Sequence, residues 1–131
     1  MAIRLYRAYS PGTRSKSVSY FDDLSNVKAE RSLTFGKKAC GGRNNRGVIT
    51  VKGRGGGHKR KYRLVDFHRK SEIAAKVATI EYDPNRNARI ALLHYKDGSK
   101  KYIVCPRSLK VGMEIYSGNG VPIEVGNAMP L

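Results

Sequence analysis

A basic, glycine-rich stretch holds the residue types of this sequence that are best suited to chemistry with a charged ligand. Between residues 31 and 65 the chain has 11 Lys or Arg, 8 Gly and no Asp or Glu. Arg supplies planar, forked hydrogen-bond donors and Lys a compact positive charge, and both bind phosphate oxygens. A segment this cationic repels itself and buries little, so it does not form a core alone. The stretch therefore predicts a surface that binds a polyanion, which we interpret as RNA.

Three consecutive glycines lie at the centre of this stretch. Gly55, Gly56 and Gly57 have no side chains, so their backbone can approach a phosphate closely and adopt φ values that other residues avoid. We interpret the adjacent His58 as a hydrogen-bonding or stacking contact to RNA. The candidate RNA-binding residues of the stretch are Arg43, Asn44, Asn45, Arg46, Lys52, Arg54, Gly55, Gly56, Gly57, His58, Lys59, Arg60, Lys61, Arg63 and Arg69.

A solvated tail or a targeting signal is the alternative interpretation of such a basic run. Apolar residues such as Val48, Ile49 and Tyr62 lie among the charges at strand-like spacing. Tails seldom carry β-branched and aromatic residues in this pattern. The interleaving favours a surface that is held by a fold.

No catalytic or nucleotide-binding constellation accompanies these residues. A P-loop requires Gly-Lys followed by Ser or Thr, but Lys59 follows His58 and precedes Arg60. The dinucleotide pattern fails too, because His58 stands where the third glycine is required. Carboxylates such as Asp66 and Asp83 are interpreted as surface or ion-pair residues rather than general bases. We expect no enzyme activity, no catalytic residue, no cofactor and no small-molecule substrate.

Metal and membrane binding are not expected either. Cys40 and Cys105 are widely separated, no Cys-x-x-Cys spacing exists and the three His are scattered. The cysteines form no disulfide framework and are interpreted as free thiols in a reducing compartment. No apolar run is long enough to span a bilayer, and the first residues lack the apolar core of a secretory signal.

The charge is distributed unevenly along the 131 residues, whose net charge is +16. Residues 1–70 contain 18 basic and 4 acidic residues, whereas residues 71–131 contain 8 and 6. The first part is therefore expected to meet the polyanion and the second to fold as an ordinary domain. We assign residues 1–60 to an extended basic arm with the glycine-rich segment, and residues 61–131 to a small barrel.

Strand-like segments dominate the second part of the chain. Asp83-Pro84-Asn85-Arg86-Asn87 is a strong turn signal, and Asp97-Gly98 predicts a tight hairpin. Five short strands at this spacing predict an all-β, five-stranded OB-fold-like barrel, although the count also fits an SH3-like barrel. The earlier residues are expected to be an extended arm (1–20) and a loop (21–38). Strands are expected at 62–69, 73–82, 88–95, 101–104 and 121–125, with a short possible strand at 47–51.

Several motifs, in order, resemble the N-terminal half of the universal large-subunit ribosomal protein two family. They are Gly42-Arg43-Asn44-Asn45-Arg46-Gly47, Arg54-Gly55-Gly56-Gly57-His58-Lys59-Arg60, Tyr62-Arg63-Leu64-Val65-Asp66-Phe67 and Glu81-Tyr82-Asp83-Pro84-Asn85-Arg86-Asn87-Ala88, followed by Gly126-Asn127-Ala128-Met129-Pro130-Leu131. The opening Met1-Ala2-Ile3-Arg4-Leu5-Tyr6 is most similar to plastid and cyanobacterial members.

The resemblance implies an OB-fold RNA-binding domain after a basic extension, and a role in the large ribosomal subunit. It implies binding to large-subunit rRNA near the peptidyl transferase region, with neighbouring ribosomal proteins as further partners. It also adds Asn85 and Arg86 to the candidate RNA contacts. The expected location is a ribosome in the plastid stroma, with the bacterial cytoplasm as the alternative. The family's second, SH3-like domain is expected to have no counterpart in these 131 residues.

A free-standing OB protein that binds single-stranded nucleic acid is the alternative function. Such proteins bind unstructured strands through exposed aromatic side chains. The chain has only 3 Phe and no Trp. This composition favours binding to structured RNA through Lys and Arg.

Overall fold

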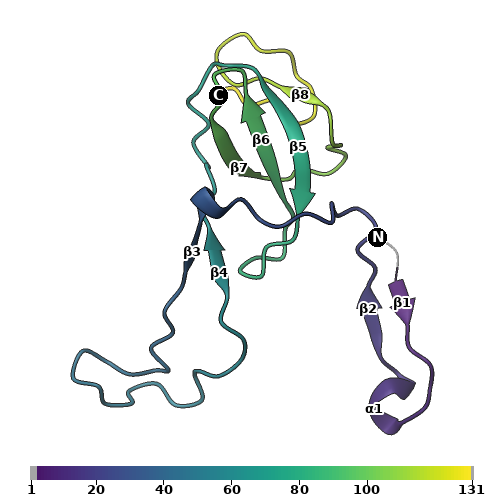
Figure 1. Ribbon diagram of the computed structural model, residues 1–131, viewed down its shortest axis with the longest axis vertical. Coiled ribbons are helices and arrows are strands. Elements are labelled where there is room, and N and C mark those ends of the chain that lie inside the picture. Colours follow the sequence, from purple (N-terminus) through teal and green to yellow (C-terminus); the bar gives the residue numbers. More distant parts are fainter. Residues whose placement is uncertain (1–2, 131) are drawn as a thin grey trace.

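The computed structural model describes residues 3–130 and shows a curled antiparallel sheet from which two arms extend (Figure 1). The strands of the sheet are β5 (Ala75–Glu81), β6 (Ile90–Tyr95), β7 (Lys100–Val104) and β8 (Glu114–Ile115). They lie in the order β7-β6-β5-β8. A bulge between Val77 and Thr79 in β5 increases the local twist, so the sheet curls into an OB-like half-barrel. The expected all-β fold class is confirmed.

The central strand β6 is buried on both faces. Its alternate residues enter two separate hydrophobic clusters, as the two-residue period of a strand requires. The larger cluster contains Ala75, Val77, Ile80, Ala91, Leu93, Tyr95, Ile103, Leu109 and Ile115. The smaller cluster contains Ile90, Leu92 and Tyr102, with Leu33 and Val65 packed against it. Leu33 and Val65 come from outside the sheet, so the smaller cluster attaches another part of the chain to it.

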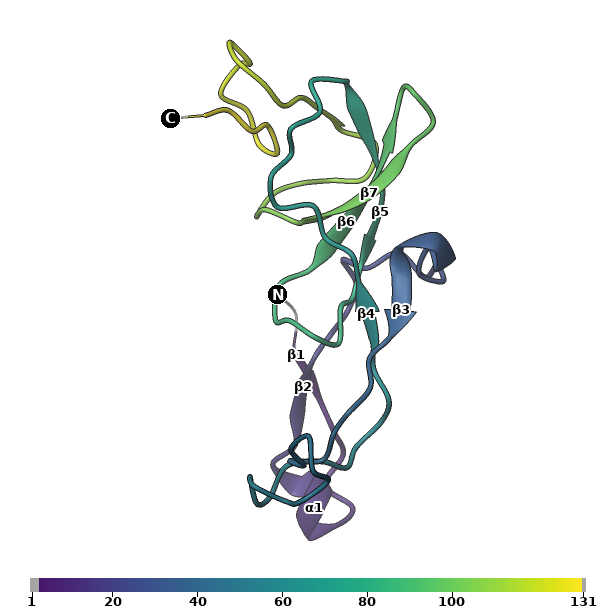
Figure 2. The same ribbon diagram turned by 90° about the vertical axis from the view of Figure 1, so that its left-hand side faces the viewer.

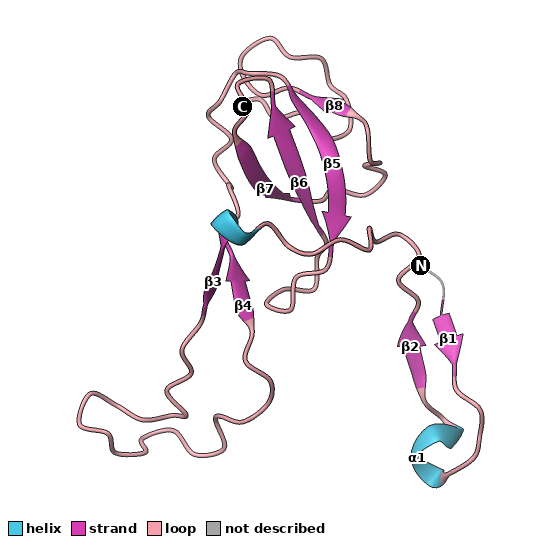
Figure 3. Ribbon diagram, viewed as in Figure 1, coloured by secondary structure: helices cyan, strands magenta, loops and turns pink. Residues whose placement is uncertain are grey.

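That part is the long arm, residues 34–63, which Leu33 and Val65 flank on its two sides. Its two ends pair as an antiparallel ladder, and the residues between them contain no helix or strand (Figure 3). A 3-10 helix precedes the ladder and supplies Leu33 to the smaller cluster. The elements are the 3-10 helix Arg31–Leu33, β3 (Thr34–Gly36) and β4 (Lys61–Arg63).

The second arm is the N-terminal hairpin, residues 3–19. It consists of β1 (Ile3–Leu5), the short helix α1 (Pro11–Arg14) and β2 (Ser17–Ser19). Figure 2, turned by 90°, shows both arms extending from the same end of the sheet. The expected extended arm therefore folds back on itself, and the short helix α1 forms its turn.

Several expected strands were wrong in their position. The segment expected to be a strand at 121–125 is irregular, because Pro122 has no N–H for a ladder and its carbonyl accepts the N–H of Glu124 at 2.9 Å. The fourth strand of the sheet is instead β8, at a position where no strand was expected. The strand expected at 47–51 is reduced to a single bridge between Arg43 and Ile49. The loop expected at 21–38 contains β3, and the strand expected at 62–69 ends at Arg63.

The hydroxyl of Tyr102 joins the long arm to the sheet. It donates to Glu81 Oε2 at 2.9 Å and accepts the backbone N–H of Glu30 at 2.8 Å. The carbonyl of Tyr102 accepts the N–H of Asp66 at 2.8 Å. Glu30 and Asp66 lie just outside the two ends of the arm, so one residue of β7 holds both ends. Burial, with a smaller contribution from Glu81, raises the pKa of Tyr102 to about 12.

Replacing Tyr102 with phenylalanine is expected to lower the free energy of unfolding by about 1–3 kcal/mol, because buried polar partners lose a hydrogen bond. Urea unfolding measures this change. Thr79→Val is the matched control, because the Thr79 hydroxyl donates to Glu81 Oε1 at 3.0 Å, a bond within the sheet. A smaller decrease in the free energy of unfolding for Tyr102→Phe than for this control would contradict the role of Tyr102 in joining the arm to the sheet.

The raised pKa of Tyr102 predicts that the free energy of unfolding decreases at alkaline pH. The unfolded phenol ionises near the ordinary pKa of 10.0 and the folded one near 12. Stability contributed by the protonated hydroxyl is therefore complete below the lower value and is lost as the pH rises through the higher one. Tyr102→Phe should lack this component in a pH series of urea unfolding.

Candidate nucleic-acid interface

The outer part of the long arm is closed by its own backbone. The carbonyl of Gly42 accepts the N–H groups of Thr50 at 3.0 Å and Val51 at 3.2 Å. Gly42 has a φ of +74°, and a Cβ at this position would collide with the Val51 carbonyl oxygen. Only glycine satisfies both the backbone angle and the close approach.

Asn44 organises the turn that follows. Its side-chain oxygen accepts the N–H groups of Arg46 at 2.9 Å and Val48 at 3.1 Å. Asn is favoured at such positions because its side chain replaces a backbone acceptor. The side chains of Arg43, Asn45 and Arg46 are exposed around this turn. The turn therefore presents two arginines to a ligand at the far end of the arm.

Residues 52–59 form an open part of the arm. Among the described residues, no backbone-to-backbone hydrogen bond involves this segment. Gly56 has a φ of +75°, and no atom lies within 4 Å of the position that a Cβ would occupy. The backbone donors of the segment and the space beside Gly56 are therefore available to a ligand such as a phosphate group.

A cationic groove of about 650 Å³ lies where this open segment faces residues 37–39, which follow β3, and the turn after β5. Four positive side chains and one histidine line it, and none of its lining residues is acidic. Such a lining attracts a phosphate backbone. The groove is lined by Lys37, Lys38, Ala39, Gly56, Gly57, His58, Lys59, Arg60 and Asn85.

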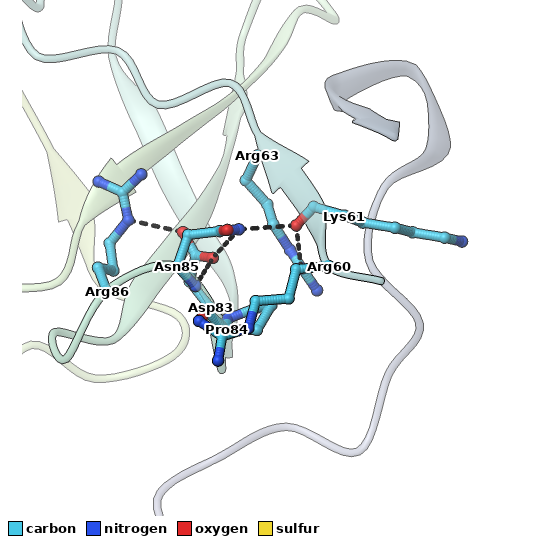
Figure 4. Close-up of polar contacts among 7 residues, drawn as sticks. All are labelled: Arg60, Lys61, Arg63, Asp83, Pro84, Asn85 and Arg86. Carbon is cyan, nitrogen blue, oxygen red and sulfur yellow. Dashed lines mark hydrogen bonds and ion pairs between the residues drawn. The ribbon is translucent and has the colours of Figure 1, made fainter. Parts of the chain in front are cut away.

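Two hydrogen bonds hold the sheet against the arm beside this groove (Figure 4). Asn85 Nδ2 donates to the carbonyl of Lys61 at 2.8 Å, and Arg60 Nη1 donates to the carbonyl of Pro84 at 3.1 Å. The Asn85 side chain thus fixes the position of β4 relative to the turn. Its contact with RNA stays a prediction.

Asp83 stabilises this turn from inside the fold. Its carboxylate is fully buried; Oδ1 accepts the N–H and Nδ2 of Asn85 at 2.9 and 3.0 Å, and Oδ2 accepts Arg86 Nε at 2.6 Å. Burial alone would raise the pKa of Asp83. The hydrogen bonds from Asn85 and Arg86 outweigh burial and hold that pKa below its ordinary value. The ionised carboxylate therefore orients both residues that the resemblance nominates.

The structure does not bring all candidate residues together. Arg69 is half-buried away from the groove, where its Nη1 donates to the carbonyl of Gly126 at 2.5 Å. Arg63 Nη1 donates to the carbonyl of Lys61 at 2.9 Å. Both arginines have fold contacts, and their RNA contacts stay predictions. The exposed Lys52, Lys61 and Arg54 do not line the groove.

Lys37 and Lys38 were not among the residues predicted to bind RNA, although both line the cationic groove. Both lie within the acid-free stretch, so their charge was visible, but no motif marked them. They reach the groove because β3 pairs with β4, which brings residues 37–39 opposite residues 56–60. This pairing is long-range and was not expected.

Membrane-spanning helices and metal-binding clusters are absent from the part of the chain that the structure describes. Within residues 3–130, no helix has the length and apolar character needed to cross a lipid bilayer. No group of three His, Cys, Asp or Glu side chains in the same range is placed to hold a metal ion. Cys40 and Cys105 are both free thiols.

An antiparallel half-barrel that carries a cationic, glycine-rich arm defines the chain as a nucleic-acid-binding protein of the OB-like class. Residues 30–117 match the family model described as Ribosomal Proteins L2, RNA binding N-terminal domain. The match covers more than half of the chain, so the chain belongs to this family. Its members are structural proteins of the large ribosomal subunit that bind rRNA, and they are not enzymes. The N-terminal hairpin lies outside the matched residues.

Replacing Gly56 with valine is expected to weaken rRNA binding by about tenfold or more, because the side chain fills the space beside the open backbone. Gly53→Val is the matched control. Gly53 has a φ of +72° and also has no atom within 4 Å of the place that a Cβ would take, but it does not line the groove. Filter binding on both variants measures the difference. Equal losses would show that backbone strain, rather than contact at the groove, causes the effect.

Proposed function

We propose that this chain binds large-subunit rRNA through the cationic groove and the outer turn of the long arm, and that it supports assembly of the subunit near its peptidyl transferase region. The observation that supports the proposal is the groove itself, in which four cations and an open glycine backbone converge and no lining residue is acidic.

In this proposal, residues 1–60 supply the arms and the rRNA-binding segment, and residues 61–131 supply the barrel that holds them. The contacts are the fifteen candidates from Arg43 to Arg69 together with Asn85 and Arg86. Neighbouring ribosomal proteins are the further partners. The similarity of the opening residues to plastid members supports a plastid ribosome.

Co-sedimentation with large ribosomal subunits after a high-salt wash tests the proposal. A specifically assembled chain stays with the subunit, whereas a chain held by charge alone is released as the salt concentration rises. Retention that is abolished by changes in the groove supports the proposal. Release of the unaltered chain at moderate salt contradicts it.

A competition experiment separates this function from that of a free-standing single-strand binder. Labelled rRNA bound to the chain is challenged with unlabelled rRNA or with an unstructured strand of equal length. Equal displacement by the two competitors would favour the single-strand binder, because aromatic stacking tolerates any sequence and structure. Much weaker displacement by the unstructured strand is expected.

A further inference from the structure

The three phenylalanines of the chain lie on its surface, but their surroundings differ. Phe21, Phe35 and Phe67 are 51%, 49% and 65% exposed. The guanidinium of Arg89 lies 4.8 Å from the ring centre of Phe21, and that of Arg86 lies 5.7 Å from the ring centre of Phe67. Among the described residues, no cation lies over the ring of Phe35. Phe35 is therefore an exposed ring that the fold leaves without a cationic cover.

Phe35 is nevertheless held in a defined position. It lies on β3 directly opposite Tyr62 on β4, and the two ring centres are 5.1 Å apart at an angle of 44°. Cross-strand aromatic pairs of this kind restrict the rotamers of both rings. The pair is thus a fixed aromatic surface on the long arm, outside both hydrophobic clusters.

A second groove, of about 380 Å³, opens at this ring. Arg31, Lys59 and Lys61 line it, and no acidic residue does. Gly36, the next residue along β3, has no side chain to fill this groove. The aliphatic part of the Lys59 side chain lies 3.5 Å from the position that a Cβ of residue 36 would occupy. An exposed aromatic side chain surrounded by positive charges can stack on an unpaired base while the charges bind the adjacent phosphates.

The two grooves share Lys59. A strand whose phosphates lie in the cationic groove would therefore pass directly beside Phe35.

We propose that Phe35 is a stacking platform for an unpaired nucleobase of the bound RNA, with Arg31, Lys59 and Lys61 holding the adjacent phosphates. This inference rests on the proposed function, because it adds a base-binding site to the same rRNA-binding surface. It assigns to the arm a contact with a base, in addition to the charge contacts of the cationic groove.

The chain has no tryptophan, so Phe35→Trp introduces a single tryptophan at the platform, whose fluorescence can be excited apart from that of the eight tyrosines. Titration with folded large-subunit rRNA is expected to quench this fluorescence, because a stacked base contacts the indole ring, and to leave the affinity near that of the unaltered chain. Phe21→Trp is the matched control and should be quenched less, because Phe21 is similarly exposed and its ring is covered by Arg89, which is not among the proposed RNA contacts. Equal quenching of the two reporters, or none at Phe35→Trp, would overturn the proposal.

Phe35→Ala is expected to weaken rRNA binding by about 5- to 150-fold, the range for one stacked base. The slope of log affinity against log salt should stay unchanged, because no phosphate contact is removed. A smaller salt dependence in Phe35→Ala would mean that the variant has lost phosphate contacts because the arm is distorted, which would count against stacking. An unchanged affinity would also count against it. If the unaltered chain does not bind rRNA, the proposed function fails; if it binds and Phe35→Ala binds equally well, only this inference fails.

Discussion

A chain in which Lys37, Lys38, Lys59 and Arg60 are all replaced with glutamine is expected to bind rRNA about 100- to 1,000-fold more weakly at physiological salt. Each phosphate contact contributes roughly −0.7 to −0.9 to the slope of log affinity against log salt concentration. Removing four contacts should therefore make this slope less steep by about 3. Filter binding across a salt series measures both quantities. The affinities of the unaltered chain and of this variant should converge as the salt concentration increases.

The control carries the same change in net charge elsewhere on the molecule. Lys76, Lys96, Arg107 and Lys110 are exposed and do not line the cationic groove. Their joint replacement with glutamine should reduce affinity far less, because charges beyond a Debye length of about 8 Å are screened. Comparable losses in the two variants would show that total charge, and not the groove, determines binding.

Replacing Asp83 with asparagine is expected to lower the free energy of unfolding by about 2–4 kcal/mol, because losing one partner of a buried ion pair leaves the other uncompensated. The substitution keeps the shape of the side chain but removes the charge that faces Arg86 at 2.6 Å. Urea unfolding at neutral pH measures the change. Asp97→Asn, the same change in an exposed turn, should cost much less.

The pH dependence gives this prediction a second readout. Because the folded-state pKa of Asp83 is lowered, its contribution is present above the ordinary value of 3.8 and is lost as the pH falls through the lower, folded value. The stability difference between the unaltered chain and Asp83→Asn should therefore shrink in acid. A difference that stays constant down to the acid transition would contradict the role assigned to the carboxylate.

Local sequence signals predicted the centre of the fold well. The Asp97-Gly98 turn joins β6 to β7 as expected, with Gly98 at a φ of +82° and Asp97 Oδ1 accepting the N–H of Ser99 at 2.9 Å. The strands expected at 73–82, 88–95 and 101–104 differ from β5, β6 and β7 by no more than two residues at each end. These strands are buried and bounded by turn residues, so their pattern is complete within a short window.

Elements that depend on distant partners could not be predicted in this way. β3 has only three residues and is a strand because it pairs with β4, which follows it at the other end of the arm's sequence. β8 has two residues and is defined by its pairing with Ala75 and Lys76. Neither segment has enough residues to show a period, so only the tertiary fold determines its conformation.

The same division applies to the candidate site. Charge and glycine content identified residues 56–60, which line the cationic groove. The contributions of Lys37 and Lys38, and the structural roles of Asn44 and Asp83, required the three-dimensional arrangement. Asp83 was interpreted as a surface or ion-pair residue, and its carboxylate is a buried member of an ion pair.

The open segment at residues 52–59 also has a consequence for the lifetime of the protein. It is exposed, rich in Lys and Arg and without backbone-to-backbone hydrogen bonds among the described residues, which are the properties of a protease-sensitive site. A trypsin-like protease should cut the free chain there first, while bound RNA would cover the cleavage sites. Unassembled copies would then be degraded faster than assembled ones, which keeps the amount of protein matched to the supply of its RNA.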